Sequence, residues 1–196
     1  MMPTQVKLVD VGPRDGLQNE ATPIATEHKV ELIHRLQAAG PREIEATSYV
    51  SPKWVPQMGD NSAVMAAIQR QAGVRYSVLT PNLKGFEGAL ASKADEVVIF
   101  AAASEAFSQR NINCSIAESI ERFRPVVDAA HANGIKVRAA VSCALGCPYE
   151  GEVSPATVND VVRQLLDIGT DHIGIADTIG VGTAGKVKQV MEGVMK

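Results

Sequence analysis

Short apolar runs that recur along the chain predict six buried β-strands. Each run is almost continuously hydrophobic and rich in β-branched residues, and it does not alternate with polar positions. That pattern is typical of strands covered on both faces, as in parallel sheets. The predicted strands are residues 6–11, 43–46, 74–79, 96–101, 135–141 and 172–176.

Amphipathic stretches lie between these runs and predict helices. Thr26 is a predicted N-cap, Ser115 begins a predicted capping box, and Ser154 is a predicted cap before a proline at the first helical position. Pro125 falls inside one stretch, where it should kink the helix or delay its start, because an interior proline costs about 3 kcal/mol. The predicted helices begin near residues 26, 60, 82, 115, 154 and 184.

The alternation of strand and helix predicts an α/β fold with a parallel sheet and right-handed crossovers. No linker, low-complexity segment or second domain interrupts residues 1–196, so a single domain is expected. No G-x-G-x-x-G follows the first strand, which weighs against dinucleotide binding. A (β/α)8 barrel needs eight units and commonly about 250 residues. Six units therefore fit either an open sheet or a barrel without its last two units.

Composition narrows the function classes. The 196 residues are 45% hydrophobic and 21% charged, with a net charge of −3. No basic cluster suggests a nucleic-acid surface, and no apolar stretch approaches the roughly 18 residues of a membrane helix. The first residues resemble neither a signal peptide nor a transit peptide. Three cysteines are too few for a disulfide scaffold and fit a reducing compartment, so a cytoplasmic location is expected.

Polar side chains gather directly after the predicted strands, where parallel α/β enzymes hold their chemistry. Arg14 and Asp15 follow the first strand, and the Gly12-Pro13 turn does not require them. Glu45 interrupts an apolar strand, so its carboxylate needs a partner, and Arg14 is the obvious one. The polar residues at later strand ends are Thr47, Ser48, Thr80, Asn82, Ser104, Glu105, Arg110, Asn111, Asn113, Ser142, Cys143, Asp177 and Thr178. Any single Ser or Thr there is ordinary, but the set predicts one catalytic rim.

Metal and thiol signals are weaker. Asp15 is a candidate ligand for a hard cation, which prefers oxygen donors, although an isolated Asp is more often a salt-bridge or capping residue. The four histidines form no His-x-His pair. Cys143 and Cys147 are spaced C-x-x-x-C, which is neither a thioredoxin-type motif nor by itself a zinc site, so they are interpreted as packing residues.

Six motifs together resemble the hydroxymethylglutaryl-CoA lyase family, from about residue 6 to the end. They are GPRDGLQNE (12–20), EATSYVSPKWVPQM (45–58), LTPNLKG (79–85), NINCS (111–115), VSCALGCPYEG (141–151) and DTIGVGT (177–183). Related isopropylmalate and homocitrate synthases share the Arg-Asp-Gly element but typically read Thr-Leu-Arg-Asp-Gly. The Gly-Pro form and the SPKWVPQM loop favour the lyase.

The resemblance implies a TIM-type (β/α)8 barrel, of which this chain supplies about the first six units. It implies cleavage of 3-hydroxy-3-methylglutaryl-CoA to acetoacetate and acetyl-CoA, as in leucine degradation, with a Mg²⁺ or Mn²⁺ ion and a homodimer in the full-length form. It implies that Arg14 stabilises the enolate and contacts the substrate. The other implied roles are metal ligand for Asp15, orienting acid for Glu45, proton transfer for Asp177, and acyl-CoA binding for Asn111, Ser115, Ser142 and Cys143.

The sequence also departs from the family. The His-Cys-His-Asp motif, an asparagine ligand and the catalytic cysteine of the last two units have no match. Gly174 and Ala184 replace a hydroxyl residue and a proline. We therefore expect an incomplete metal site, little lyase activity from the 196-residue chain alone, and a tendency to associate. The alternatives are a related acyl-CoA aldolase or Claisen-type synthase, and a non-catalytic fragment that binds CoA esters weakly.

Overall fold

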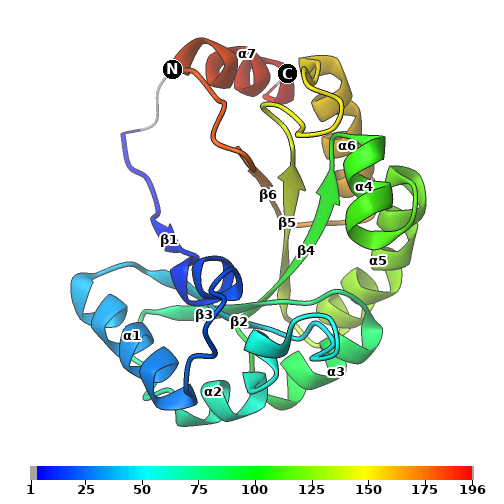
Figure 1. The fold of residues 1–196 in the computed structure, drawn as a ribbon. Helices are drawn as coiled ribbons and strands as arrows, with labels where there is room; N and C mark the ends of the chain where they lie inside the picture. Colours follow the sequence, from blue (N-terminus) through cyan, green and yellow to red (C-terminus); the bar gives the residue numbers. More distant parts are fainter. Residues whose placement is uncertain (1–3, 196) are drawn as a thin grey trace. The chain divides into compact units, whose positions relative to one another are not determined.

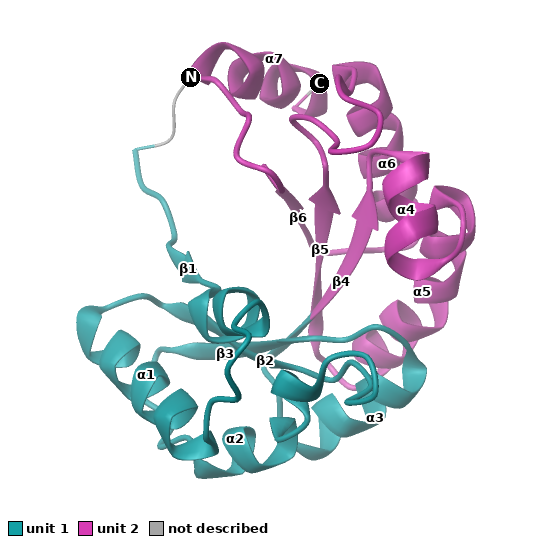
Figure 2. Ribbon diagram, in the orientation of Figure 1, with its two compact units in different colours: residues 1–97 teal, residues 98–196 magenta. Residues whose placement is uncertain are grey.

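The computed structural model describes residues 4–195, in which strands and helices alternate along the chain (Figure 1). It divides into two compact units, residues 1–97 and 98–196 (Figure 2). Within each unit, neighbouring strands follow one another in chain order. No helix in residues 4–195 combines the length and the apolar character needed to cross a membrane.

The first unit is a parallel sheet with helices between its strands. Its elements are β1 (Val9–Asp10), η1 (Gly12–Gly16), α1 (Thr26–Ala39), β2 (Glu43–Ser48), η2 (Pro56–Met58), α2 (Asn61–Ala67), β3 (Arg75–Leu79) and α3 (Leu83–Ala91). β2 pairs with β1 and β3, and every residue of β2 is buried. The register between β2 and β3 shifts between Glu45 and Thr47. Such an irregularity re-aims neighbouring side chains, and here it lies beside the acid expected to partner Arg14.

The second unit repeats the strand–helix alternation. Its elements are β4 (Glu96–Ala102, which begins at the end of the first unit), α4 (Glu105–Ile112), α5 (Ile116–Ala132), β5 (Lys136–Ser142), α6 (Pro155–Asp167), β6 (His172–Ile175) and α7 (Ala184–Val194). β5 and β6 pair in parallel, with Arg138 opposite His172 and Val141 opposite Ile175. The carboxyl ends of β5 and β6 therefore lie together, and polar residues follow both.

Each unit has its own apolar core, in which helix faces cover strand residues. In the first unit, α1 and α2 bury Ile33 and Val64. In the second, α5 packs Phe123 edge-on against Phe100 of β4, with 5.4 Å between ring centroids. The fully or almost fully buried apolar residues include Ile33, Ile44, Val64, Val78, Ile99, Ile120, Phe123, Val137, Val158, Val161 and Leu165. The inward positions of α6 recur at helical spacing, as its sequence pattern predicts.

Two of the predicted helix caps are confirmed. The Ser115 hydroxyl accepts a hydrogen bond from Glu118 N, and the Glu118 carboxylate accepts one from Ser115 N at 2.8 Å, which completes the capping box. Ser154 caps α6 by accepting from Thr157 N at 3.1 Å. Both caps satisfy backbone N–H groups that the first helical turn leaves unpaired.

Two local predictions are wrong, and half of a third is excluded. Thr26 does not cap α1, because it is the first helical residue and its hydroxyl donates to Asp60 instead, at 2.7 Å. Pro125 does not delay the start of α5, which runs through it from Ile116 to Ala132, so the predicted kink is the alternative that stays a prediction. β1 is two residues long instead of six, and the upstream Val6 and Leu8 are exposed. The eight-residue α4 was not predicted at all, because a polar stretch after a strand reads as a loop.

Glu43 should make the stability of the protein depend on pH. Its fully buried carboxylate accepts from Lys7 and Arg75, each at 2.7 Å. Burial is the largest influence and would raise the pKa of Glu43, but hydrogen bonds from Glu96, Lys7 and Arg75 outweigh it and lower that pKa to about 2. A depressed pKa stabilises the fold above the unfolded value near 4.5, and this stabilisation is lost as the pH falls toward 2.

We therefore expect the urea midpoint of the parent to fall between pH 5 and pH 3 more steeply than that of Glu43→Gln, by an equivalent of about 2 kcal/mol. Urea unfolding followed by circular dichroism at several pH values measures the difference. Glu192→Gln, at an exposed position on α7, is the matched control and should follow the parent. Parallel pH profiles for the parent and Glu43→Gln would contradict the assignment.

Candidate active site

The loop after β1 presents Arg14 and Asp15 on a single helical turn, η1. Gly12 N donates to the Asp10 carboxylate at 2.9 Å, which closes the strand end. Arg14 N and Asp15 N then both donate to Val11 O, at 3.2 and 2.7 Å. The backbone of this turn is therefore satisfied locally, and the two charged side chains are held in adjacent positions.

The predicted pairing of Arg14 with Glu45 is confirmed. The Arg14 guanidinium donates through Nε to the Glu45 carboxylate and through Nη1 to Asp15 Oδ1, the latter at 2.6 Å. The side chain of Glu45 is 1% exposed, that of Arg14 14%, and that of Asp15 58%. A buried carboxylate thus anchors one edge of the guanidinium, while the exposed Asp15 lies at its other side. Such a fork–carboxylate arrangement fixes the orientation of an arginine.

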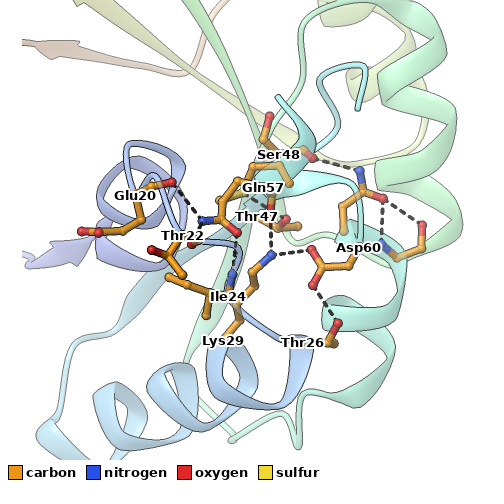
Figure 3. A network of polar contacts seen from close by, with 12 residues as sticks. Glu20, Thr22, Ile24, Thr26, Lys29, Thr47, Ser48, Gln57 and Asp60 are labelled. Carbon is orange, nitrogen blue, oxygen red and sulfur yellow. Dashed lines mark hydrogen bonds and ion pairs between the residues drawn. The ribbon is translucent and has the colours of Figure 1, made fainter. Parts of the chain in front are cut away.

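A second group of residues holds the chain that follows η1. Figure 3 shows the Gln57 side chain reaching the backbone of residues 20–24. Gln57 Nε2 donates to Glu20 O at 3.2 Å and to Thr22 O at 2.9 Å, and Gln57 Oε1 accepts from Ile24 N at 2.9 Å. One amide therefore makes three hydrogen bonds to a loop that has little regular structure of its own.

Lys29 on α1 also binds residues of this network and holds Gln57 in place. Figure 3 shows its ammonium group between Gln57 and Asp60. The buried Nζ donates to Gln57 O and to Asp60 Oδ1, the latter at 2.7 Å. Asp60 Oδ2 in turn accepts from the Thr26 hydroxyl. Because only three residues lie between the end of η1 and the chain from Glu20 to Ile24, this network restrains the carboxyl-terminal side of the turn that carries Arg14 and Asp15.

Replacing Lys29 should destabilise the protein. Lys29→Met keeps the length of the side chain but removes both interactions of the ammonium, and it leaves Asp60 without a cation at a mostly buried position. Breaking a buried pair costs about 3–5 kcal/mol, and partial exposure of Asp60 reduces the expected loss to about 2–3 kcal/mol. Urea unfolding measures it. Lys84→Met, at an exposed position on α3, should change the unfolding free energy by less than about 0.5 kcal/mol; equal losses in the two variants would contradict the role of Lys29.

A cavity of about 540 Å³ lies beside this network in the first unit. Its lining includes Gln18, Ile24, Lys29, Trp54 and Gln57, and the Trp54 side chain is largely exposed at its rim. The volume falls within the range of small-molecule pockets. Arg14, Asp15 and Glu45 are not among the lining residues, so this cavity does not coincide with the predicted catalytic side chains of the first unit.

Asp177 lies in the second unit, directly after β6, and its carboxylate organises the following loop. Asp177 Oδ1 accepts from Val181 N at 3.1 Å, and Oδ2 accepts from Gly182 N at 2.8 Å. A Cβ on Gly182 would come within 2.5 Å of Leu145 Cδ1 and 2.8 Å of Asp177 Oδ2, so a side chain there would have to displace one or both of these side chains. Asp177 itself is exposed. Its carboxylate is therefore both fixed by the backbone and open to solvent.

Ser142 and Cys143 end β5 next to this loop. Cys143 N donates to the Thr178 hydroxyl at 2.7 Å, and Ala144 N donates to Ala176 O at 3.3 Å. Cys143 adopts a left-handed conformation, with φ of 59°, which is rare for a residue with a side chain. The structure thus brings Ser142, Cys143 and Asp177 to one edge of the second unit.

Asn111 and Ser115 lie at the junction of α4 and α5. Asn111 is an exposed residue in the last turn of α4. The hydroxyl of Ser115 is already engaged in the capping box with Glu118, at 3.0 Å from its carboxylate. Beside this junction, Arg110 lies over the Tyr149 ring at 4.2 Å from its centroid. A structural role therefore accounts for Ser115, whereas Asn111 is free of that constraint.

The residues at hand do not form a complete metal site. Within residues 4–195, no three His, Cys, Asp or Glu side chains are grouped so that they could hold a metal ion. Asp15 is a single carboxylate, and one of its oxygens accepts from Arg14. A hard divalent cation takes about six oxygen ligands, so Asp15 alone does not fit that requirement.

Some contacts of the site carry no obvious sequence signal. The network of Lys29, Gln57 and Asp60 was not predicted. Gln57 binds backbone groups, and since every residue has them, the sequence does not show which ones it binds. The Ser104 hydroxyl lies 3.0 Å from Cys147 Sγ, a contact that the C-x-x-x-C spacing alone did not suggest. A lysine on the inward face of α1, four residues before Ile33, was the available hint for the first network.

Comparison with known proteins places these features in one family. Residues 5–196 match the HMGL-like family, to which the chain belongs. It is 55% identical over its whole length to human mitochondrial hydroxymethylglutaryl-CoA lyase, of which it covers 60%, and 54% identical over 99% of its length to the zebrafish protein named cytoplasmic 3-hydroxy-3-methylglutaryl-CoA lyase, of which it covers 58%. The crystal structure of hydroxymethylglutaryl-CoA lyase from Pseudomonas aeruginosa matches 98% of the chain and 64% of its own, with 55% identity and a TM-score of 0.95.

The predicted family and fold class are therefore confirmed: the parallel β/α units of this chain are those of a TIM-type barrel lyase family. The chain spans about 60% of the length of the curated relatives that it matches. These relatives bear both mitochondrial and cytoplasmic names, so the comparison does not select one compartment.

Proposed function

We propose that the chain carries catalytic and substrate-binding residues of a lyase that cleaves 3-hydroxy-3-methylglutaryl-CoA to acetoacetate and acetyl-CoA. The observation that carries the proposal is Arg14, held by the buried carboxylate of Glu45, within a chain 55% identical to a protein of that name. The substrate is thus an acyl-CoA. The three cysteines are free, which supports a reducing compartment such as the cytoplasm.

The chemistry requires a positive group where negative charge develops. The tertiary hydroxyl loses its proton, the adjacent C–C bond breaks, and the electron pair moves onto the thioester as an enolate while the hydroxyl carbon becomes the ketone of acetoacetate. We assign Arg14 to the enolate oxygen, because an oriented donor there is worth more in the transition state than in the ground state. Glu45 then acts as a positioning residue that fixes the guanidinium.

Proton transfer needs a carboxylate that both a substrate and solvent can reach. Asp177 meets that requirement, since it is exposed and fixed by two backbone N–H groups. We assign it to moving the hydroxyl proton, or to returning one to the enolate carbon. Asn111, Ser115, Ser142 and Cys143 are assigned to acyl-CoA contacts, with Ser115 the weakest of them because its hydroxyl serves the helix cap.

A divalent cation would bind the substrate hydroxyl and lower its pKa. Asp15 is proposed as one carboxylate ligand of such an ion. The grouped ligands that a hard cation needs are not found among residues 4–195, so Asp15 alone would not hold the ion. Mg²⁺ and Mn²⁺ are equally suited to one carboxylate oxygen, and a homodimer remains a prediction of the family resemblance.

A chimera tests the proposal directly. In it, residues 5–196 replace the matching stretch of the Pseudomonas aeruginosa lyase, and formation of acetoacetate and acetyl-CoA from 3-hydroxy-3-methylglutaryl-CoA is measured. We expect cleavage within about tenfold of the parent lyase, lost with a chelator and restored by Mg²⁺ or Mn²⁺. A folded chimera without cleavage would contradict the proposal, and condensation of acetyl-CoA with a 2-oxoacid would assign the chain to a synthase instead.

A further inference from the structure

A tight turn in the second unit encloses the sulfur of Cys147. Cys147 and Gly151 form two backbone hydrogen bonds, Cys147 N to Gly151 O at 2.8 Å and Gly151 N to Cys147 O at 2.9 Å. The residues from Pro148 to Gly151 are exposed, whereas Cys147 itself is 3% exposed. Cys147 is therefore buried next to an exposed turn of the chain.

Several hydrogen-bond donors converge on this sulfur. Tyr149 N donates to Cys147 Sγ at 3.3 Å, and Glu150 N also donates to it. The Ser104 hydroxyl lies 3.0 Å away. Because Ser104 Oγ already accepts from Phe107 N at 3.0 Å, its own proton is available for the sulfur. Convergent donors of this kind favour a sulfur that carries negative charge.

Cys143 supplies a further hydrogen-bond donor, and the pKa of its own thiol is shifted in the opposite direction to that of Cys147. Its thiol donates to Cys147 Sγ, and Cys143 is fully buried. Burial, with the neighbouring Cys147 as the next cause, raises the pKa of Cys143 to about 11. For Cys147, burial is again the largest single influence and acts upward, but the donors from Ser104, Tyr149, Glu150 and Cys143 together lower the pKa. The pKa values of the two thiols are thus shifted in opposite directions, that of Cys147 downward and that of Cys143 upward.

We propose that Cys147 and Cys143 form a peroxide-sensitive thiol pair, a modification site that shares Cys143 with the proposed acyl-CoA contacts. The Cys147 thiolate attacks a peroxide oxygen, the O–O bond breaks, and the products are a Cys147 sulfenic acid and hydroxide, so sulfur is oxidised and the peroxide is reduced. The Cys143 sulfur then attacks Cys147 Sγ, its proton leaves with the departing hydroxyl as water, and an intrachain disulfide forms.

The position of the pair gives the bond a structural consequence. Cys143 follows Ser142 at the end of β5, and its N–H binds the Thr178 hydroxyl at 2.7 Å. Cys147 lies beside the N-cap of α4 through Ser104. A disulfide removes the hydrogen bonds that both sulfurs make as thiol and thiolate, and it ties the end of β5 to the exposed turn. Oxidation would therefore change the structure at the edge of the second unit that contains Ser142 and Asp177.

The test uses the full 196-residue chain with hydrogen peroxide, followed by peptide mapping. We expect a product that has lost two hydrogen atoms across Cys143 and Cys147 and that dithiothreitol reverses. Cys147 should react at least about tenfold faster than Cys114, which is equally buried and serves as the internal control. In Cys143→Ala, dimedone should trap a sulfenic acid on Cys147; in Cys147→Ala, Cys143 should stay reduced. Ser104→Ala should slow the first step several-fold.

Other outcomes would contradict the proposal that Cys147 and Cys143 form a thiol pair. Reaction at Cys143 or Cys114 before Cys147, or a Cys143→Ala variant that forms no sulfenic acid at Cys147, would contradict the assigned order. The measurement is repeated in urea below the unfolding transition. An oxidation rate that rises in proportion to the unfolded fraction would show that only the unfolded chain reacts. Because every readout is a covalent product on cysteine, the result is independent of whether the lyase proposal holds.

Discussion

Replacing Arg14 is expected to remove most of the lyase activity of the chimera while leaving the fold in place. Arg14→Gln keeps two polar atoms but loses the charge, so the developing enolate loses its electrostatic partner. Removing one such donor typically lowers kcat by about 10²–10³-fold. Arg14→Lys restores a charge without the planar fork that Glu45 and Asp15 hold, so it should recover only a small part of the rate.

Whether the substitution changes kcat or KM distinguishes stabilisation of the enolate from simple binding of the substrate. A group that acts mainly in the transition state lowers kcat and kcat/KM together, whereas one that binds substrate and transition state equally raises KM alone. Arg124→Gln is the matched control, since Arg124 is an exposed arginine of α5 paired with Glu121 at 2.8 Å. It should leave both constants unchanged. An Arg14→Gln chimera with kcat within about threefold of the parent would exclude the enolate role.

Strands, caps and the main pairing of the site were predictable for identifiable physical reasons. Continuous apolar runs marked β2 to β4 because these strands of a parallel sheet are buried along almost their whole length. The same kind of run also marked β5 and β6, although their residues are less completely buried. The Ser115 box and the Ser154 cap were predictable because both lie within four residues of their partners. Glu45 pointed to Arg14 because a carboxylate in an apolar strand requires a partner, and only one cation lay in the preceding motif.

The failures share a different cause: they depend on contacts between residues remote in sequence. Thr26 has the right chemistry for a cap, yet its hydroxyl serves Asp60, which lies 34 positions away. The network around Gln57 and Lys29 depends on backbone carbonyls, which every residue possesses. The Cys147 environment likewise depends on Ser104, which lies 43 positions away. Residue type and spacing alone do not reveal such partners.

Replacing Glu45 should separate the stability of the site from its catalysis. Glu45→Ala removes a carboxylate that is 1% exposed and leaves the Arg14 guanidinium without its buried anchor. Loss of one member of a buried pair costs about 3–5 kcal/mol. Arg14 retains the exposed Asp15 and some access to solvent, so the expected loss in unfolding free energy is about 2–4 kcal/mol. Glu45→Gln keeps the shape and an acceptor oxygen and should cost less than Glu45→Ala.

Catalysis should respond differently from stability in these two variants. In Glu45→Gln the fold is largely retained, but the guanidinium loses a charged acceptor and its fixed orientation, so kcat should fall about tenfold or more while KM changes little. A Glu45→Gln chimera that keeps the parent kcat would show that Glu45 supports the fold only. Urea unfolding and steady-state kinetics on the same preparations provide the two readouts.

A double-mutant cycle then tests whether Glu45 acts through Arg14. Residues in contact show coupling energies of about 0.5–3 kcal/mol, whereas distant residues add independently. If Glu45 only positions the guanidinium, Glu45→Gln should have almost no further effect on kcat in an Arg14→Gln background. Glu121→Gln, which disrupts the exposed pair on α5, should instead give the same small change in both backgrounds. Additive losses for Arg14 and Glu45 would mean that the carboxylate has its own contact with the reacting substrate, and the role of positioning residue would be withdrawn.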